Sequence, residues 1–256
     1  MARVIAIANQ KGGVGKTTTA ISLGAALSEL GARVLLVDMD SQGTLSIALG
    51  VHGIDKTVYD VLRDLELAME DILVPTATKC DLAPSDIHLA GAEVELINEP
   101  GREYILKDKL ASLQKMYDYI LLDCPPSLGV LTLNALTAAD EVLIPVQVHY
   151  LAFRGMQLLL TTISKVKGRL NPSLEVMGIL PTFYDRRTRH SKEVAEQLRE
   201  HYREKVINIP IPATIKFADT TTAGESILTF SNSSPAAAAY RKLATEVHNG
   251  KANKRR

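Results

Sequence analysis

The sequence contains no tryptophan, only two cysteines and no apolar run long enough to cross a lipid bilayer. With only Cys80 and Cys124 in 256 residues, a disulfide-stabilised fold and a zinc site built on cysteine pairs are both excluded, and a reducing cytoplasm is the expected location. The apolar run over 142–148 contains proline and glutamine, and it is far shorter than the roughly 20 residues of a membrane helix. We therefore expect no insertion into a membrane.

The chain also lacks a net charge, because 29 basic residues balance 29 acidic ones. The charges are nevertheless separated along the chain. Residues 1–179 hold 15 Lys and Arg against 21 Asp and Glu, whereas residues 180–256 hold 14 against 8. This asymmetry favours an anionic partner for the C-terminal third, such as nucleic acid. A basic surface exposed to solvent, followed by a basic tail, is the alternative explanation.

Five apolar segments of strand length alternate with amphipathic segments of helix length. The predicted strands are 4–8, 34–37, 119–122, 142–148 and 176–180, and the predicted helices are 16–30, 103–115, 131–138, 154–170, 191–203 and 235–247. The strands are apolar almost throughout, as strands covered on both faces are. The pattern predicts an α/β fold, with a doubly wound, mostly parallel sheet and helices on both faces.

Domain boundaries are not evident, since no Ser/Gly-rich linker interrupts the chain. We predict a single domain over 1–256, with a short basic tail at 249–256 that we expect to be disordered. The stretch 52–95 is the least regular, and its elements cannot be placed from the sequence.

A glycine-rich segment follows the first predicted strand and opens the first predicted helix. Its glycines, Gly12, Gly13 and Gly15, allow backbone N–H groups to face phosphate oxygens, and the helix N-terminus adds a partial positive charge. Lys16 can reach the β- and γ-phosphates, and the Thr17 hydroxyl can bind Mg²⁺. The segment is therefore predicted to bind the phosphates of a nucleotide.

This loop departs from the usual phosphate-loop pattern, because Gln10 stands five residues before Gly15 where a glycine is expected. Lys11 places a second ammonium group at the mouth of the loop. A dinucleotide-binding fingerprint with Asp38 as its acidic residue is the rival interpretation, but Thr18 stands where that fingerprint needs its third small residue.

Two further strands end in carboxylates. Asp123 follows the apolar run 119–122, and it is predicted to hold a magnesium-bound water beside Thr17. The strand 34–37 leads into Asp38 and Asp40, in a loop that ends at Gly43 and could move with the γ-phosphate. The alternative for either aspartate alone is a helix cap.

Taken together, these segments resemble the deviant Walker A, A′ and B motifs of the ParA/Soj partition ATPases, within the ParA/MinD superfamily. The matching runs are 11–18 (Lys-Gly-Gly-Val-Gly-Lys-Thr-Thr), 38–43 (Asp-Met-Asp-Ser-Gln-Gly) and 122–127 (Leu-Asp-Cys-Pro-Pro-Ser). The resemblance continues through 131–136, 145–147 and 183–188, so it covers nearly the whole chain.

The resemblance implies a weak ATPase with ATP and Mg²⁺ as cofactors. The implied nucleotide-binding residues are Lys11, Gly12, Gly13, Val14, Gly15, Lys16, Thr17, Thr18 and Pro212, whose backbone would face the base. The implied magnesium residues are Thr17, Asp38 and Asp123. Among the expected catalytic residues Lys11, Lys16 and Asp40, Lys11 would reach the ATP of a second subunit and Asp40 would position the attacking water.

The resemblance also implies three partners: a second copy of the chain in an ATP-dependent homodimer, non-specific double-stranded DNA, and a ParB/Spo0J-like centromere-binding protein that stimulates hydrolysis. The protein would be cytoplasmic and nucleoid-associated. The expected DNA-binding residues are Arg186, Arg187, Arg189 and Lys216. The alternative is that these side chains form ion pairs with Glu193, Glu196 and Glu200 on the same predicted helix.

The chain departs from the family pattern at 212–215, which reads Pro-Ala-Thr-Ile in place of Pro-Arg-Asn-Val, and at 219–224. Two other functions share the mechanism: positioning of a different cargo, and a MinD-like ATPase at a membrane surface. The second requires a C-terminal amphipathic helix, whereas 248–256 carries basic residues without an apolar stripe. An electron-transfer protein like the nitrogenase iron protein would need cluster-binding cysteines, which Cys80 and Cys124 do not match.

Overall fold

The protein is described by a computed structural model that covers residues 1–149 and 152–250. The predicted disordered tail lies mostly outside these residues, since 251–256 are not described. Asn249 and Gly250 directly follow the last helix, and their N–H groups donate to carbonyls of its final turn.

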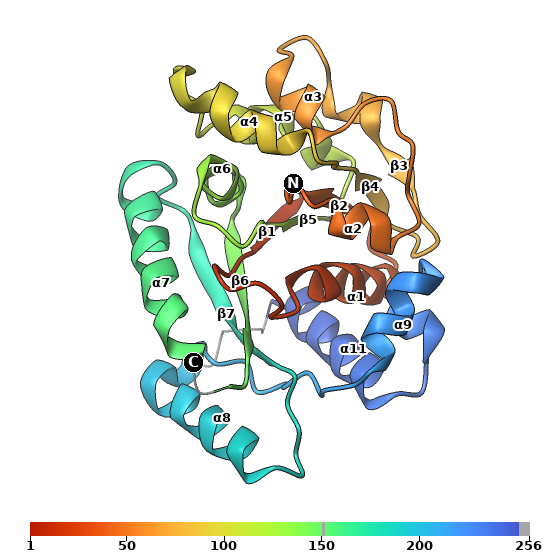
Figure 1. Ribbon diagram of the computed structural model, residues 1–256, viewed down its shortest axis with the longest axis vertical. Helices are drawn as coiled ribbons and strands as arrows, with labels where there is room; N and C mark the ends of the chain where they lie inside the picture. Colours follow the sequence, from red (N-terminus) through yellow and green to blue (C-terminus); the bar gives the residue numbers. More distant parts are fainter. Residues whose placement is uncertain (150–151, 251–256) are drawn as a thin grey trace.

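One sheet of seven strands runs through the molecule in the order β3-β4-β2-β5-β1-β6-β7 (Figure 1). The strands are β1 (Arg3–Ile7), β2 (Val34–Asp38), β3 (Val74–Pro75), β4 (Asp81–Ala83), β5 (Tyr119–Asp123), β6 (Glu141–Gln147) and β7 (Glu175–Thr182). The pairings are parallel except that of β3 with β4. The predicted α/β class and the mostly parallel sheet are confirmed.

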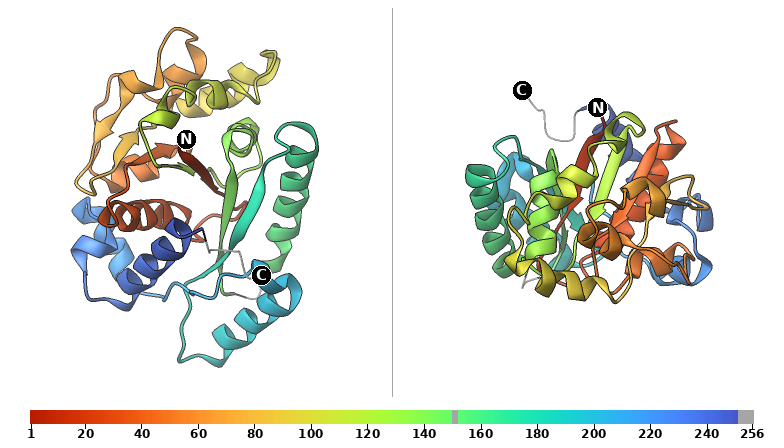
Figure 2. Two further views of the ribbon diagram at one scale, coloured as in Figure 1. Left: turned by 180° about the vertical axis from the view of Figure 1, so that it is seen from behind. Right: turned by 90° about the horizontal axis from the view of Figure 1, so that it is seen from above.

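Helices cover both faces of the sheet (Figures 1 and 2). One face packs against α1 (Lys16–Glu29), α2 (Thr44–Ala48), α9 (Lys216–Ala223), α10 (Ile227–Phe230) and α11 (Pro235–His248). The other packs against α3 (Val58–Arg63), α4 (Leu89–Glu95), α5 (Ile105–Lys109), α6 (Val130–Ala138) and α7 (Ala152–Arg169). Helix α8 (Arg189–Tyr202) lies beyond the end of β7, at one end of the molecule.

The register of the central strands places the site. Asp123 at the end of β5 pairs with Asp38 at the end of β2 and with Ile7 at the end of β1. Because these strands are parallel, the loops that follow all three leave the sheet at the same edge.

The predicted helix over 103–115 is wrong, because this segment forms the short α5 and a separate 3₁₀ turn over Leu113–Lys115. Its apolar side chains are still buried at helical spacing, at 106, 110 and 113. Tertiary hydrogen bonds replace the expected continuous ladder. The Leu106 N–H donates to the Asn134 side chain, and the Lys109 ammonium donates to the carbonyls of 64, 65 and 67.

The stretch 52–95 contains α3, β3, β4, α4 and a 3₁₀ turn over Met69–Ile72. Its strands have two and three residues, which is too short for an alternation of side chains to be detected in sequence.

Substitution of Gly178 in β7 would test how closely the sheet packs against the segment 205–207. A Cβ atom at this position would lie 2.6 Å from Ile207 Cγ1 and 3.2 Å from the Lys205 carbonyl oxygen. We expect Gly178→Ala to lower the free energy of unfolding by about 1–3 kcal/mol through overpacking, measured by urea denaturation. Gly168→Ala in α7 is the matched control, because a Cβ there meets nothing within 4 Å and should stabilise the helix by about 0.5–1 kcal/mol. If Gly178→Ala and Gly168→Ala changed the free energy of unfolding equally, the close packing of Ile207 against Gly178 would be contradicted.

Candidate functional site

The loop between β1 and α1 has the backbone shape of a phosphate-binding site. Gly13 (φ 70°) and Gly15 (φ 87°) adopt left-handed conformations that other residues rarely take. Gly15 directly precedes α1, and no side chain caps this helix N-terminus. The first N–H groups of a 14-residue helix therefore remain for an anion.

Two other strands hold the loop in place. The Asn9 amide donates to the Pro145 carbonyl at 2.7 Å, and its oxygen accepts from the Lys11 N–H at 3.0 Å. The Thr182 hydroxyl donates to the Val14 carbonyl at 2.8 Å. The sequence gives no signal for these anchors, because their partners are 136 and 168 residues away.

The two predicted lysines lie at the loop in different environments. Lys16 is only 7% exposed, and its ammonium lies 3.4 Å from the Lys11 carbonyl, to which it donates. The Lys11 ammonium is half-buried and donates to the Gln147 side-chain oxygen at 3.3 Å. In the single chain, Lys11 is therefore held by the end of β6.

Beneath the loop, the predicted magnesium residues come together. The Thr17 hydroxyl donates to Asp123 Oδ2 at 2.6 Å, and Asp123 Oδ1 is buried without a hydrogen-bond partner. On the neighbouring strand, Asp38 Oδ2 accepts from the Ser46 N–H at 3.0 Å and from its hydroxyl at 2.8 Å. Asp38 Oδ1 accepts from the Asp40 N–H at 3.2 Å.

The two buried carboxylates are electrostatically strained. Burial, and then the charge of Asp38, raises the pKa of Asp123 to about 8. Burial also raises the pKa of Asp38 to about 6, although the hydrogen bonds from Ser46 oppose this rise. A cation beside the unpartnered Asp123 oxygen would relieve the strain, because a nearby positive charge favours both charged forms.

The donor set fits magnesium held jointly with a nucleotide. Within 1–149 and 152–250, no three His, Cys, Asp or Glu side chains are placed to hold a metal ion on their own. A hydroxyl and carboxylates that bind the ion or its waters, completed by phosphate oxygens, are the usual Mg²⁺ environment in nucleotide enzymes.

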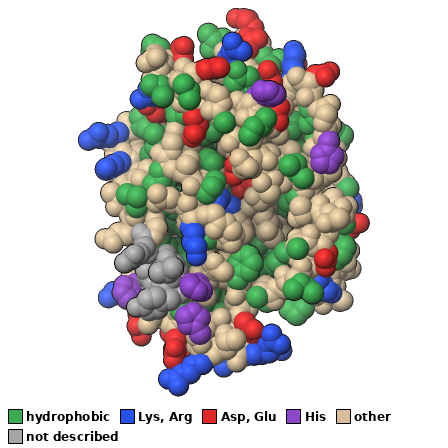
Figure 3. Space-filling model, viewed as in Figure 1, with side chains coloured by type: hydrophobic (Ala, Val, Ile, Leu, Met, Phe, Trp, Pro, Cys, Tyr) green, Lys and Arg blue, Asp and Glu red, His purple; other side chains and the backbone are tan. Residues whose placement is uncertain are grey.

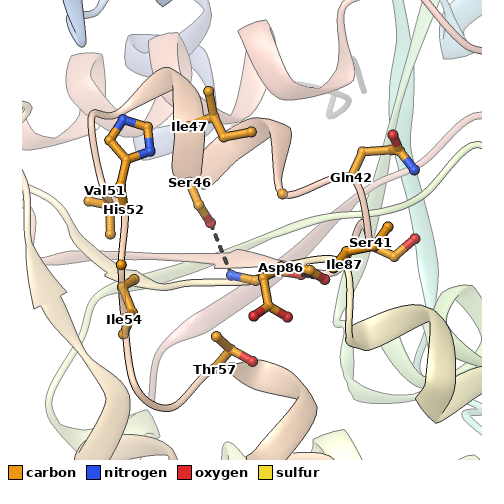
Figure 4. A pocket seen from close by; sticks show the side chains of 13 residues that line it. Ser41, Gln42, Ser46, Ile47, Val51, His52, Ile54, Thr57, Asp86 and Ile87 are labelled. Carbon is orange, nitrogen blue, oxygen red and sulfur yellow. Dashed lines mark hydrogen bonds between the residues drawn. The ribbon is translucent and has the colours of Figure 1, made fainter.

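Asp40 lies in the loop that follows β2. It is half-buried, its Oδ1 accepts from the Gln42 N–H at 3.0 Å, and its carbonyl accepts from the Ser85 hydroxyl at 3.0 Å. A cavity of about 370 Å³ lies against this loop (Figure 4). Ser46 and Ser85, which the sequence analysis missed, connect the loop to the end of β4.

The predicted DNA-binding residues are exposed but largely paired. Arg187 forms a bidentate ion pair with Asp185, which lowers the pKa of that carboxyl to about 2. Arg189 pairs with Glu193, as the alternative interpretation expected for this one residue. The Lys216 ammonium donates to the Ser231 hydroxyl at 2.7 Å. Lys and Arg side chains gather at the α8 end of the molecule (Figure 3).

Two segments join this surface to the nucleotide loop. Tyr184 forms a parallel bridge with Pro212, the residue predicted to face the base. Tyr184 comes two residues after Thr182, which holds the loop through Val14. From the bridge the chain continues to Arg186 on one side and to Lys216 on the other, and α8 and α9 then diverge (Figure 1).

Comparisons with known proteins agree with this geometry. A family model described as an AAA domain matches residues 2–176. The sporulation initiation inhibitor protein Soj of Bacillus subtilis is 44% identical over 249 residues, which cover 96% of this chain and 98% of Soj. The chromosome partitioning protein ParA of Caulobacter vibrioides is 45% identical over 250 residues, which cover 96% and 93%. The chain belongs to the ParA/Soj family of partition ATPases.

A crystal structure also shares this fold. It is described as cobyrinic acid a,c-diamide synthase from Mycobacterium smegmatis with bound ADP and magnesium. Its TM-score is 0.87 at 45% identity, with 97% of this chain and 95% of that chain covered. The predicted membership of the ParA/Soj family is confirmed, and the structural relative binds a nucleotide and the metal that the sequence predicts here.

The raised pKa values of Asp38 and Asp123 predict that the stability of the protein depends on pH. Since the pKa of folded Asp123 lies above its ordinary value of 3.8, the fold loses stability as pH rises towards about 8. Without nucleotide, we expect Asp123→Asn to raise Tm at pH 8 by roughly 2–8 °C, corresponding to about 1–2 kcal/mol, and to change it little near pH 4.

Differential scanning calorimetry at several pH values measures the effect. Asp118→Asn is the control, because Arg33 lowers the pKa of Asp118 and the sign is reversed. A difference in Tm between wild type and Asp123→Asn that does not vary with pH would contradict the prediction.

Proposed function

We propose that the protein is an ATP-driven partition ATPase whose ATP-bound homodimer binds double-stranded DNA without sequence preference and releases it after hydrolysis. The observation that carries the proposal is the Thr17–Asp123 contact under a loop with two lysines, in a chain 44–45% identical to Soj and ParA over 96% of its length. We propose that residues 1–256 act as one domain.

The loop residues bind the nucleotide. The N–H groups of 12–18 face the phosphates, and Lys16 neutralises the β- and γ-oxygens from a nearly buried position. Thr17, Asp38 and Asp123 would hold magnesium or its waters, and the ion supplies positive charge to the phosphates when bound. Asp40, on the adjacent loop, orients the attacking water.

Lys11 makes dimerisation depend on ATP. In the single chain its ammonium has a neutral acceptor, Gln147, at 3.3 Å. Exchange of this contact for the γ-phosphate of a second subunit's ATP gives a charge-assisted hydrogen bond, which is stronger. Hydrolysis removes that acceptor and weakens the dimer.

The α8 surface supplies the DNA contacts. The Arg187 and Arg189 side chains are 84% and 92% exposed. Ion pairs at such exposed positions contribute little to stability, so the arginines can exchange their carboxylate partners for DNA phosphates at little cost. Two subunits double the number of phosphate contacts, which gives nucleoid association. A ParB-like centromere-binding protein is the proposed stimulator of hydrolysis.

Three alternatives have less support. Positioning of another cargo would use the same residues and depends only on the partner. A MinD-like function at a membrane surface would need a C-terminal amphipathic helix, and the sequence at 248–256 has basic residues without an apolar stripe. Catalysis by a cysteine thiolate is the third, and both cysteines are unsuitable, since burial raises the pKa of Cys80 to about 12 and also raises that of Cys124.

Sedimentation with long duplex DNA tests the proposed function. We expect the wild type to sediment with ATP but not with ADP or without nucleotide, and less at higher salt. Asp40→Ala should still sediment, because it binds ATP without hydrolysing it, whereas Arg187→Glu should not. Lys107→Glu is the control, since α5 lies at the opposite end of the molecule from α8. Equal sedimentation with ATP, with ADP and without nucleotide would refute the proposal that ATP controls DNA binding.

Light scattering with sedimentation velocity tests the role of Lys11. With ATP and magnesium, Asp40→Ala should be a dimer, and the double variant Lys11→Ala/Asp40→Ala should remain monomeric while it still binds ATP through Lys16. Gln147→Ala removes only the acceptor within the chain, and it should leave the dimer intact. A dimer that persists without Lys11 would exclude the cross-subunit contact.

A further inference from the structure

A hydrogen-bond relay connects the segment after β4 to Asp38, the last residue of β2, and to Asp40 in the loop that follows. The Ser46 hydroxyl accepts from the Ser85 N–H at 3.0 Å, which is the dashed line in Figure 4. It also donates to Asp38 Oδ2 at 2.8 Å. The Ser85 hydroxyl donates to the Asp40 carbonyl at 3.0 Å. We propose that Ser46 and Ser85 are positioning residues for ATP hydrolysis, an inference that rests on the proposed function because Asp40 is the residue that orients the water.

Burial makes this relay specific. Ser46 is 2% exposed and Ser85 is 6% exposed, so water cannot readily replace a lost partner. The Ser46 hydroxyl uses both its donor and its acceptor capacity, and its N–H donates to the same Asp38 oxygen at 3.0 Å. Ser46 therefore binds one oxygen of Asp38 through two hydrogen bonds.

Besides the hydrogen bond from the Met39 N–H to the Asp123 carbonyl at 3.0 Å, the loop is held at its far end against the backbone of 85. Gly43 has a φ of 57°, and a Cβ atom there would lie 2.9 Å from the Ser85 carbonyl oxygen, so the loop is in close contact with the backbone of 85. On another side lies the cavity of about 370 Å³, whose walls include Ser41, Gln42 and Gly43. Figure 4 shows side chains from α2, from 51–57 and from 85–87 around this space.

Because of this cavity, the position of the Asp40 loop depends on these few hydrogen bonds. Where side chains pack closely, a loop keeps its place after one hydrogen bond is lost, but empty space allows it to shift. Displacement of a water-positioning group by about 1 Å can reduce a rate about 100-fold. Nucleotide affinity should be spared, since the phosphates are bound by 11–18 on a different strand connection.

The two serines can be separated experimentally. Ser85→Ala removes the tie to Asp40 but keeps the N–H that binds Ser46. Ser46→Ala removes the hydroxyl on Asp38 and leaves the Ser85 N–H without its acceptor. Because both changes break one relay, the effect of the double variant should be smaller than the product of the single effects.

Steady-state ATPase assays and equilibrium ATP binding give the first readout. We expect each alanine variant to lower kcat by about 10- to 100-fold, and Ser85→Ala, which does not touch the magnesium residues, to leave the ATP dissociation constant and ATP-dependent dimerisation nearly unchanged. Ser46→Thr keeps the hydroxyl and should restore much of the rate. Ser234→Ala is the matched control, because it removes another mostly buried hydroxyl, the cap of α11, without contact to the loop. Unchanged kcat, or an equal loss in affinity, would overturn the proposal.

Amide hydrogen exchange in the nucleotide-free protein gives a second readout that does not need hydrolysis. Ser85→Ala should speed exchange at 42–47 at least several-fold, whereas Ser234→Ala should not. If the wild type failed to hydrolyse ATP, the proposed function would fall, and exchange would still decide whether Ser85 holds the loop. Unchanged exchange in Ser85→Ala would overturn that role by itself.

Discussion

Two carboxylates buried side by side at the end of the central strands are the constraint on which the site depends. Asp38 and Asp123 are paired in the register of β2 and β5, so the fold buries two acids side by side. Burial raises the pKa of both. Hydrogen bonds from Thr17 and Ser46 compensate in part, and one Asp123 oxygen remains unpartnered. A cation beside this oxygen would favour the charged forms of both carboxylates.

The same strand edge explains how a small chain can connect nucleotide and partner binding. Thr182 holds the phosphate loop at the end of β7, and the bridge between Tyr184 and Pro212 follows within two residues. The basic segments begin directly after that bridge, at Arg186 and Lys216. The nucleotide loop and the proposed DNA surface are therefore neighbours in the fold, although the arginines and the loop are more than 150 residues apart in sequence.

The loop that carries Asp40 differs from the phosphate loop in how it is supported. The phosphate loop is anchored by Asn9 and by Thr182 to strands on one side of β1. The Asp40 loop is tied to β5 by the hydrogen bond from the Met39 N–H to the Asp123 carbonyl and to the segment after β4 by the Ser85 hydroxyl, and it borders the cavity of about 370 Å³.

The sequence alone determined the parallel α/β fold, the phosphate loop and the strand-end aspartates. These features are local: a glycine pattern sets the loop backbone, and an apolar run followed by a carboxylate sets an acid at the sheet edge. Only the tertiary structure decided the partners of these groups, including Asn9 with Pro145 and Ser46 with Ser85, and the division of 103–115 into two short pieces. Such contacts join residues that packing brings together from distant parts of the chain, and no local pattern of side chains encodes them.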